Sequence, residues 1–181
     1  IASTASITIR KYGLFTQGDG DDHRFSGVMT IDGGRFHLGA VAWTELTAPG
    51  YGLVFTDGGR ITSGNTYYDN PLRLLTDVSY DAASESQAIW VRPSNTGHHT
   101  RSLYLTYNAA SATRTFDVAD STTLAAGVPE MVIEHQLRET PGEVAGLRKI
   151  GSGTLELAAD DGHGGNGNLY TGTTTIEAGT L

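Results

Sequence analysis

Apolar and polar residues alternate with a period of two along most of the chain, in short runs separated by glycine and other turn residues. Within 26–40, Val28 and Thr30 share one face before a Gly-Gly turn, and Phe36 and Leu38 share one face after it. The stretch 51–64 repeats this design, and similar runs stand at 102–107, 154–158 and 173–181. Such alternation predicts strands of about four to six residues joined by tight turns.

Helix and strand compete only in the segment 128–139, "VPEMVIEHQLRE". Val132, Ile133 and Leu137 would share one face of a helix. The flanking period-two pattern favours a strand followed by a loop, and we predict that arrangement.

Two of the turns carry the same tetrapeptide, Asp-Gly-Gly-Arg, at 32–35 and 57–60. The surrounding stretches 28–39 and 53–64 align at a period of 25 residues, and "TIEAGTL" at 175–181 is a third variant. A period of 20 to 30 residues in a β-rich chain predicts the coils of a β-solenoid. Stacking in register would place Asp32 beside Asp57 and Arg35 beside Arg60, about 4.8 Å apart.

The composition and net charge of the chain argue against several classes of partner. The chain has 181 residues, 24 glycines, no cysteine and a net charge of −8. Its few basic residues form no cluster, which argues against nucleic acid and against an anionic membrane as partners. No apolar stretch is long enough to span a membrane and no signal peptide is visible. The pattern continues to both ends of the chain, so we expect a single domain, 1–181, from a longer protein.

The C-terminal segment carries a more specific motif. Its members are Leu147, Lys149, Gly151, Gly153, Leu155, Leu157, Tyr170, Gly172, Thr174, Ile176, Gly179 and Leu181. In this order they resemble the autotransporter-associated β-strand repeat, and 114–127 resembles the coil that precedes that repeat. The departure from the family pattern is a longer stretch between Leu157 and Tyr170.

This resemblance implies a right-handed parallel β-helix in the passenger of a secreted bacterial surface protein, found outside the cell or on its surface. The family's passengers are exported through a C-terminal barrel, which this sequence lacks. The implied role is a non-enzymatic scaffold that serves adhesion or self-association and supports folding during secretion. A host surface or matrix protein, a glycan or a second copy of the chain would be its partner. A toxin segment is an alternative.

Two acidic stretches raise the possibility of calcium. Asp19, Asp21, Asp22 and His23 stand together, and the dense carboxylates would supply oxygen ligands. Their spacing is not that of a helix-loop-helix calcium motif, and a solvated loop is favoured. "DDGHGGNGN" at 160–168 partly fits the Gly-Gly-x-Gly-x-Asp nonapeptide, but it does not recur. We therefore assign no metal site.

Other candidate groups are also given a structural interpretation. His98 and His99 are adjacent, so on a strand they would point to opposite faces. Trp43, Trp90, Tyr104 and the pair 67–68 would stack on sugars or pack in the core. The chain has neither a Gly-x-Ser-x-Gly elbow nor a phosphate-binding loop.

A carbohydrate-active β-helix enzyme, a lyase or hydrolase, is the competing class. It would use carboxylates such as Asp32 and Asp57 with Arg35 and Arg60 on one sheet face. Aspartate before Gly-Gly is also a common turn residue, so we favour coil corners over an active site. We assign no catalytic residue, no cofactor and no enzymatic activity.

Overall fold

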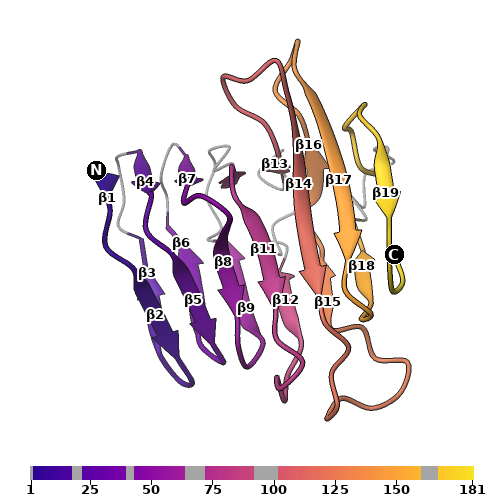
Figure 1. Ribbon diagram of the computed structural model, residues 1–181. Helices are drawn as coiled ribbons and strands as arrows, with labels where there is room; N and C mark the ends of the chain where they lie inside the picture. The colour runs from indigo at the N-terminus through magenta and orange to yellow at the C-terminus, as the bar shows by residue number, and fades with distance from the viewer. Residues whose placement is uncertain (1, 18–21, 40–42, 64–71, 92–101, 160–166) are drawn as a thin grey trace.

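The computed structural model describes residues 2–17, 22–39, 43–63, 72–91, 102–159 and 167–181. Over these ranges its regular elements are all strands, arranged in three parallel sheets along one axis (Figure 1). Sheet A consists of β1 (Ala2–Ser3), β4 (His23–Phe25), β7 (Thr44–Leu46), β10 (Leu72–Leu74), β13 (Ser102–Tyr104) and β16 (Gln136–Arg138). Sheet B consists of β2 (Ile7–Arg10), β5 (Met29–Asp32), β8 (Tyr51–Phe55), β11 (Asp77–Tyr80), β14 (Ser111–Val118), β17 (Val144–Ile150) and β19 (Thr174–Ile176). Sheet C consists of β3 (Leu14–Thr16), β6 (Arg35–Leu38), β9 (Gly59–Ser63), β12 (Ala88–Val91), β15 (Met131–Ile133) and β18 (Leu155–Leu157).

From β1 to β18 the chain visits sheets A, B and C in turn, and each strand up to β15 pairs with the strand three places further along the chain. The last strand, β19, returns to sheet B and pairs with β17. All pairings between these strands are parallel. One coil therefore comprises three strands, and successive coils hydrogen-bond along the axis. This is the parallel β-helix that the period-two pattern and the repeat predict.

One apolar core, to which all three sheets contribute, runs along the axis. In sheet C its central column is formed by Phe15, Phe36, Ile61, Trp90, Ile133 and Leu157. In sheet B a matching column is formed by Ile9, Ile31, Phe55, Tyr80 and Val118. The predicted inward positions Phe36, Leu38, Leu103, Leu105 and Leu155 are all buried.

The repeat alignment is right after the Gly-Gly turn and wrong before it. Phe36 pairs with Ile61, a step of 25 residues, but Met29 pairs with Leu53, a step of 24. The second turn holds one more residue than the first. The inward residues of β5 are consequently Met29 and Ile31, both fully buried, whereas Val28 is 36% exposed.

The segment 128–139 is a strand, as predicted, but a second strand takes the place of the expected loop. β15 ends at Ile133 and β16 begins at Gln136, in the next sheet. Glu134 and His135 form the corner between them. Ile133 and Leu137 both enter the core, from sheets C and A respectively.

Lys149 occupies an inward position, in a column with Phe116 on one side and Ile176 on the other. Its side chain is fully buried, and burial lowers the pKa of its ammonium. Nζ donates hydrogen bonds to the carbonyls of Ile150 (2.7 Å), Gly151 (2.7 Å) and Ala178 (3.2 Å). The lysine of the C-terminal motif thus fastens the corner of the last coil to the coil before it.

Glycine at the repeated corner is required by the neighbouring coil. Gly58 has a φ of 66°, and a Cβ there would lie 2.1 Å from the carbonyl oxygen of Ser86. Gly50 has a similar φ of 64°, but a Cβ there would meet nothing within 4 Å. A substitution at Gly50 therefore tests backbone strain alone, whereas the same substitution at Gly58 adds a steric clash with the neighbouring coil.

We expect Gly50→Ala to destabilise the protein by about 1 kcal/mol, the cost of a left-handed alanine. Gly58→Ala carries the same strain and also pushes two coils apart, so we expect a loss of at least about 3 kcal/mol. Denaturant unfolding of both variants measures the difference. Equal losses would mean that contact between coils does not dictate this glycine.

Lys149→Met keeps the stem of the side chain but leaves three carbonyls without their donor, and we expect it to destabilise the fold by about 2–4 kcal/mol. Arg148→Met is the matched control. Arg148 also bridges to the last coil, through Glu177 at 2.7 Å, but both side chains are over 40% exposed and the pair contributes little. Thermal unfolding should rank the Lys149 variant well below the control, and a reversed order would refute the role of Lys149.

Candidate functional site

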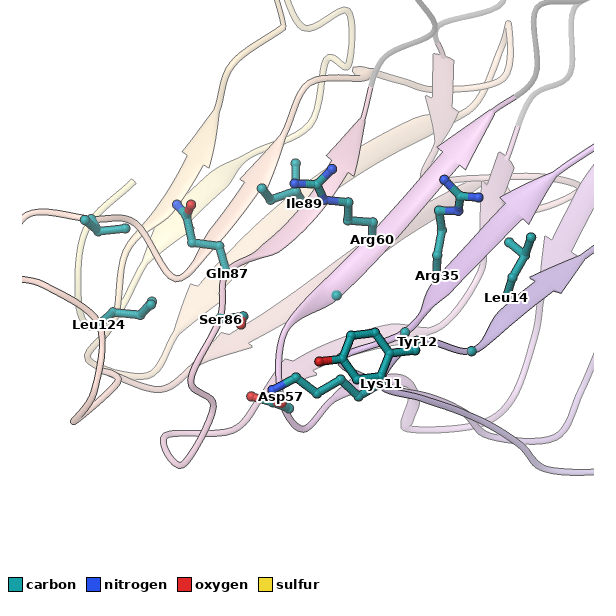
Figure 2. Close-up of a pocket in the computed structure, with 15 residues that line it drawn as sticks. Lys11, Tyr12, Leu14, Arg35, Asp57, Arg60, Ser86, Gln87, Ile89 and Leu124 are labelled. Carbon is teal, nitrogen blue, oxygen red and sulfur yellow. Dashed lines mark ion pairs between the residues drawn. The ribbon is translucent and has the colours of Figure 1, made fainter.

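The repeated corner between sheets B and C borders a shallow groove of about 630 Å³, called here the corner groove (Figure 2). Its floor is formed by the outer face of sheet C, with Arg35, Arg60 and Ile89. One wall is the turn at Lys11 and Tyr12, after β2. The opposite wall comes from the 119–130 connection, which projects from the stack between β14 and β15 (Figure 1).

Arg35 and Arg60 pair in register on β6 and β9, as the repeat predicts. Both are exposed, and Leu14 and Ile89 flank them in the same outward column. Among the described residues, no carboxylate lies within 4 Å of either guanidinium. We call this pair the arginine column; it places two cations side by side on neighbouring coils.

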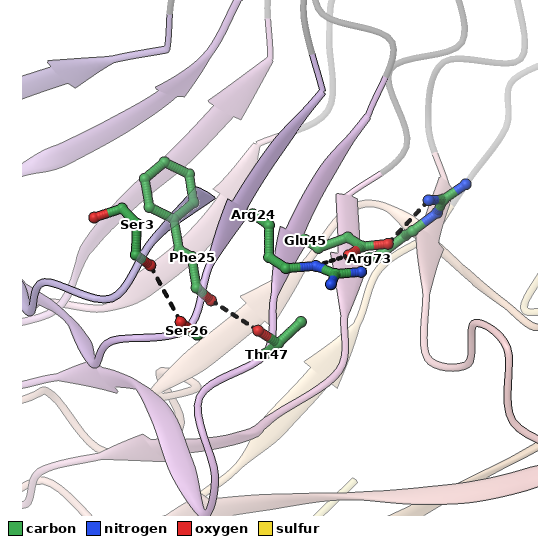
Figure 3. A network of polar contacts seen from close by, with 7 residues as sticks. All are labelled: Ser3, Arg24, Phe25, Ser26, Glu45, Thr47 and Arg73. Carbon is green, nitrogen blue, oxygen red and sulfur yellow. Dashed lines mark hydrogen bonds and ion pairs between the residues drawn. The ribbon is translucent and has the colours of Figure 1, made fainter. Parts of the chain in front are cut away.

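On the outer face of sheet A, by contrast, the arginines are paired with a carboxylate. Arg24, Glu45 and Arg73 follow one another in a single outward column. Glu45, whose side chain has no exposed surface, accepts from Arg24 at 2.7 Å and from Arg73 at 3.0 Å (Figure 3). The Arg73 guanidinium also lies 4.5 Å from the ring centre of Trp43 and 3.5 Å from that of Tyr107. These charges and rings are used in holding coils together.

The predicted stacking of Asp32 on Asp57 is wrong. The extra residue in the second turn aligns Asp32 with Thr56, whose Oγ1 donates to Asp32 Oδ1 at 3.0 Å. Asp57 accepts the backbone N–H of Glu85 at 2.9 Å and lies 3.8 Å from Lys11 Nζ. Both aspartates therefore brace the corner and do not form a pair of acids.

The far wall of the corner groove is fixed by hydrogen bonds. Gln87 Nε2 donates to the carbonyl of Pro129 at 2.7 Å. The hydroxyls of Ser121 and Thr123 both donate to the carbonyl of Ser84, at 2.9 and 2.7 Å. These bonds tie the 119–130 connection to the corner before β12, so the wall is preorganised.

Tyr12 stands at the rim of the near wall (Figure 2). It is 95% exposed, and it adopts a φ of 65°, which non-glycine residues rarely do. No pattern in the sequence distinguishes this tyrosine from those in strands. Sequence reasoning missed it, and only the turn geometry reveals it.

The remaining candidates divide into three groups. Trp90 is buried in the core and offers no stacking face. Trp43 is half-buried and packs on Arg73, and Tyr104 is half-buried on the outer face of sheet A. Asp22 and His23 are described, with His23 in β4 stacked near Phe25 at 6.4 Å between ring centres. Outside the described residues lie Asp19, Asp21, 67–68, His98, His99 and 160–166. Among the described residues, no three His, Asp or Glu side chains gather as a metal site, and no helix could cross a bilayer.

His135 is the most perturbed acid–base group of the described chain, but its place is structural. It is 4% exposed at the β15–β16 corner, and burial lowers its pKa to about 4. Its Nδ1 lies 3.3 Å from the carbonyl oxygen of Trp90. A second histidine, His37 on β6, lies outside the core. Partial burial, and secondly the charge of Arg35, lower its pKa, so His37 adds little positive charge near the groove.

Comparison of this sequence and fold with family models, curated proteins and solved structures finds no match.

The buried imidazole gives the fold an acid-sensitive step. An unfolded histidine titrates near 6.5, whereas His135 titrates near 4, so the unfolded chain binds a proton first as the pH falls. Stability should therefore fall between pH 6.5 and 4, by about 3 kcal/mol in total from this residue. Denaturant unfolding across this range measures it. Between pH 6.5 and 4, the free energy of unfolding of His135→Gln should fall by about 3 kcal/mol less than that of the parent. If the two proteins show the same dependence of stability on pH, His135 is not the group responsible.

Proposed function

We propose that this chain is a non-enzymatic β-helical scaffold segment from the passenger of a secreted, autotransporter-like bacterial surface protein. It works outside the cell, in adhesion or self-association, and the stack of coils carries the binding surface. Partners would be a host surface or matrix protein, a glycan or another copy of the chain.

The observation that carries this proposal is the use of the charged side chains. Asp32 and Asp57 brace corners, and Glu45 joins two coils. Glu139 accepts the N–H groups of Ala145 and Thr171, which lower the pKa of its carboxyl. In the described chain these acids are committed to holding coils and do not converge on a point where a substrate could react.

The roles of the C-terminal motif residues support the proposed origin. Lys149 fastens the last coil, and Gly179, at a φ of 73°, would bring a Cβ within 2.2 Å of the carbonyl oxygen of Gly153. Ile176 pairs with Lys149 across the coils. At Lys149 and Gly179, two of the positions that carry the family resemblance, stacking therefore leaves little choice of residue.

Two measurements test the proposal. Displayed on a non-adherent bacterium, the chain should increase attachment to host cells or matrix, or cause clumping of the displaying cells. The purified chain should release no reducing or unsaturated ends from carboxylated, sulfated or neutral polysaccharides. Display that changes neither attachment nor clumping would overturn the adhesive role. Depolymerisation that is lost in Asp32→Asn or Asp57→Asn would establish the enzyme instead.

A further inference from the structure

The arginine column has the charge and exposure of a binding site for an anionic ligand. Two guanidinium groups on neighbouring strands are about 4.8 Å apart at their backbones, and their repulsion costs on the order of 1 kcal/mol in water. On sheet A the same spacing is neutralised by Glu45, whereas the described chain provides no acid for Arg35 and Arg60. A protein with a net charge of −8 thus keeps a local cationic site exposed.

The surroundings of the column suit a ligand with both acidic groups and apolar faces. Leu14 and Ile89 flank the arginines along the floor, and Leu124 lies on the far wall. Tyr12 and Lys11 rise on the near wall and are exposed (Figure 2). An exposed aromatic ring beside cations and aliphatic surface matches a ligand whose rings carry anionic substituents.

The backbone beneath the two arginines is not available for recognition. β6 lies between β3 and β9, and β9 lies between β6 and β12, so the strands that carry Arg35 and Arg60 are paired on both sides. A peptide cannot add to them as a further strand. Recognition must therefore come from side chains on the sheet face, which favours forked guanidinium contacts to carboxylate or sulfate groups.

We propose that the corner groove binds a linear acidic polysaccharide, with successive carboxylate or sulfate groups on Arg35 and Arg60 and a sugar ring against Tyr12. The two arginines lie one coil apart, so the polysaccharide runs along the helix axis. The inference deepens the adhesive function proposed above, on which it rests, by naming the chemistry of the partner.

The test is isothermal titration of the purified chain with four probes of similar length at physiological ionic strength. Oligogalacturonate carries carboxylates, sulfated dextran oligomers carry sulfates, maltohexaose is neutral, and oligoglutamate is an acidic peptide. We expect binding of at least one acidic saccharide and none of maltohexaose, and the two acidic arms identify the anion. Absence of binding to both acidic saccharides overturns the site. Equal or tighter binding of oligoglutamate with the same dependence on Arg35 and Arg60 overturns the assignment to a saccharide.

Variants locate the binding. Arg35→Gln/Arg60→Gln should weaken it at least about tenfold, the loss of two charge-assisted contacts. Arg35→Gln should weaken it more than Arg148→Gln, which makes the same charge change away from the groove. Arg35→Lys should restore only part of the affinity, since lysine lacks the fork. Tyr12→Asn, which tolerates the left-handed backbone, should also weaken saccharide binding.

Folding is monitored by thermal unfolding, which should not fall in the double variant because the repulsion between the arginines is removed. Saccharide binding that is equal in the parent, the double variant and Arg148→Gln would place the ligand elsewhere and overturn the site. Failure here is distinguishable from failure of the adhesive role, because the display assay scores attachment or clumping through any surface of the chain.

Discussion

Hydrogen bonding from coil to coil is the interaction on which this structure depends. Because each strand up to β15 pairs with the strand three places along the chain, one register governs both faces of each sheet. An inward residue must match the inward residue of the next coil, and an outward residue must tolerate its outward neighbour. The chain changes length mainly at corners, where the strands are interrupted, and within the sheets it does so where β8 carries one extra residue opposite Asp77 and Val78 of β11.

The register between coils also determines how charged side chains on the outer face interact. A side chain on the outer face meets its counterpart about 4.8 Å away, so like charges repel and opposite charges attract at every step. The column of Arg24, Glu45 and Arg73 uses this spacing to join three coils. Arg35 and Arg60 use it to present two cations together. Both arrangements arise from one geometry. In the first an acid stands between two arginines and bridges them, whereas in the second two arginines are direct neighbours.

The sequence predicts the coil because period-two alternation and a repeated turn are local signals. It cannot reveal a one-residue difference between two turns, since Asp57 and Asp32 stand before the same Gly-Gly pair and only their partners in the stack distinguish them. The strand after His135 is hidden for a similar reason: a corner of two residues leaves no turn signature such as glycine or proline. Lys149 fits the family motif, yet its inward position contradicts the usual preference of lysine for the surface and is explained only by the carbonyls it meets.

The corner groove shows how a regular stack acquires a local site without losing its register. The 119–130 connection leaves β14 and returns at β15, so its extra residues alter neither the sheets nor the core. Its hydrogen bonds to Ser84 and Gln87 hold it against an earlier corner, where it forms a wall over strands that precede it in the chain. Recognition in such a fold is built from the outer face of a sheet and an inserted corner. The arginine column is where these two elements meet.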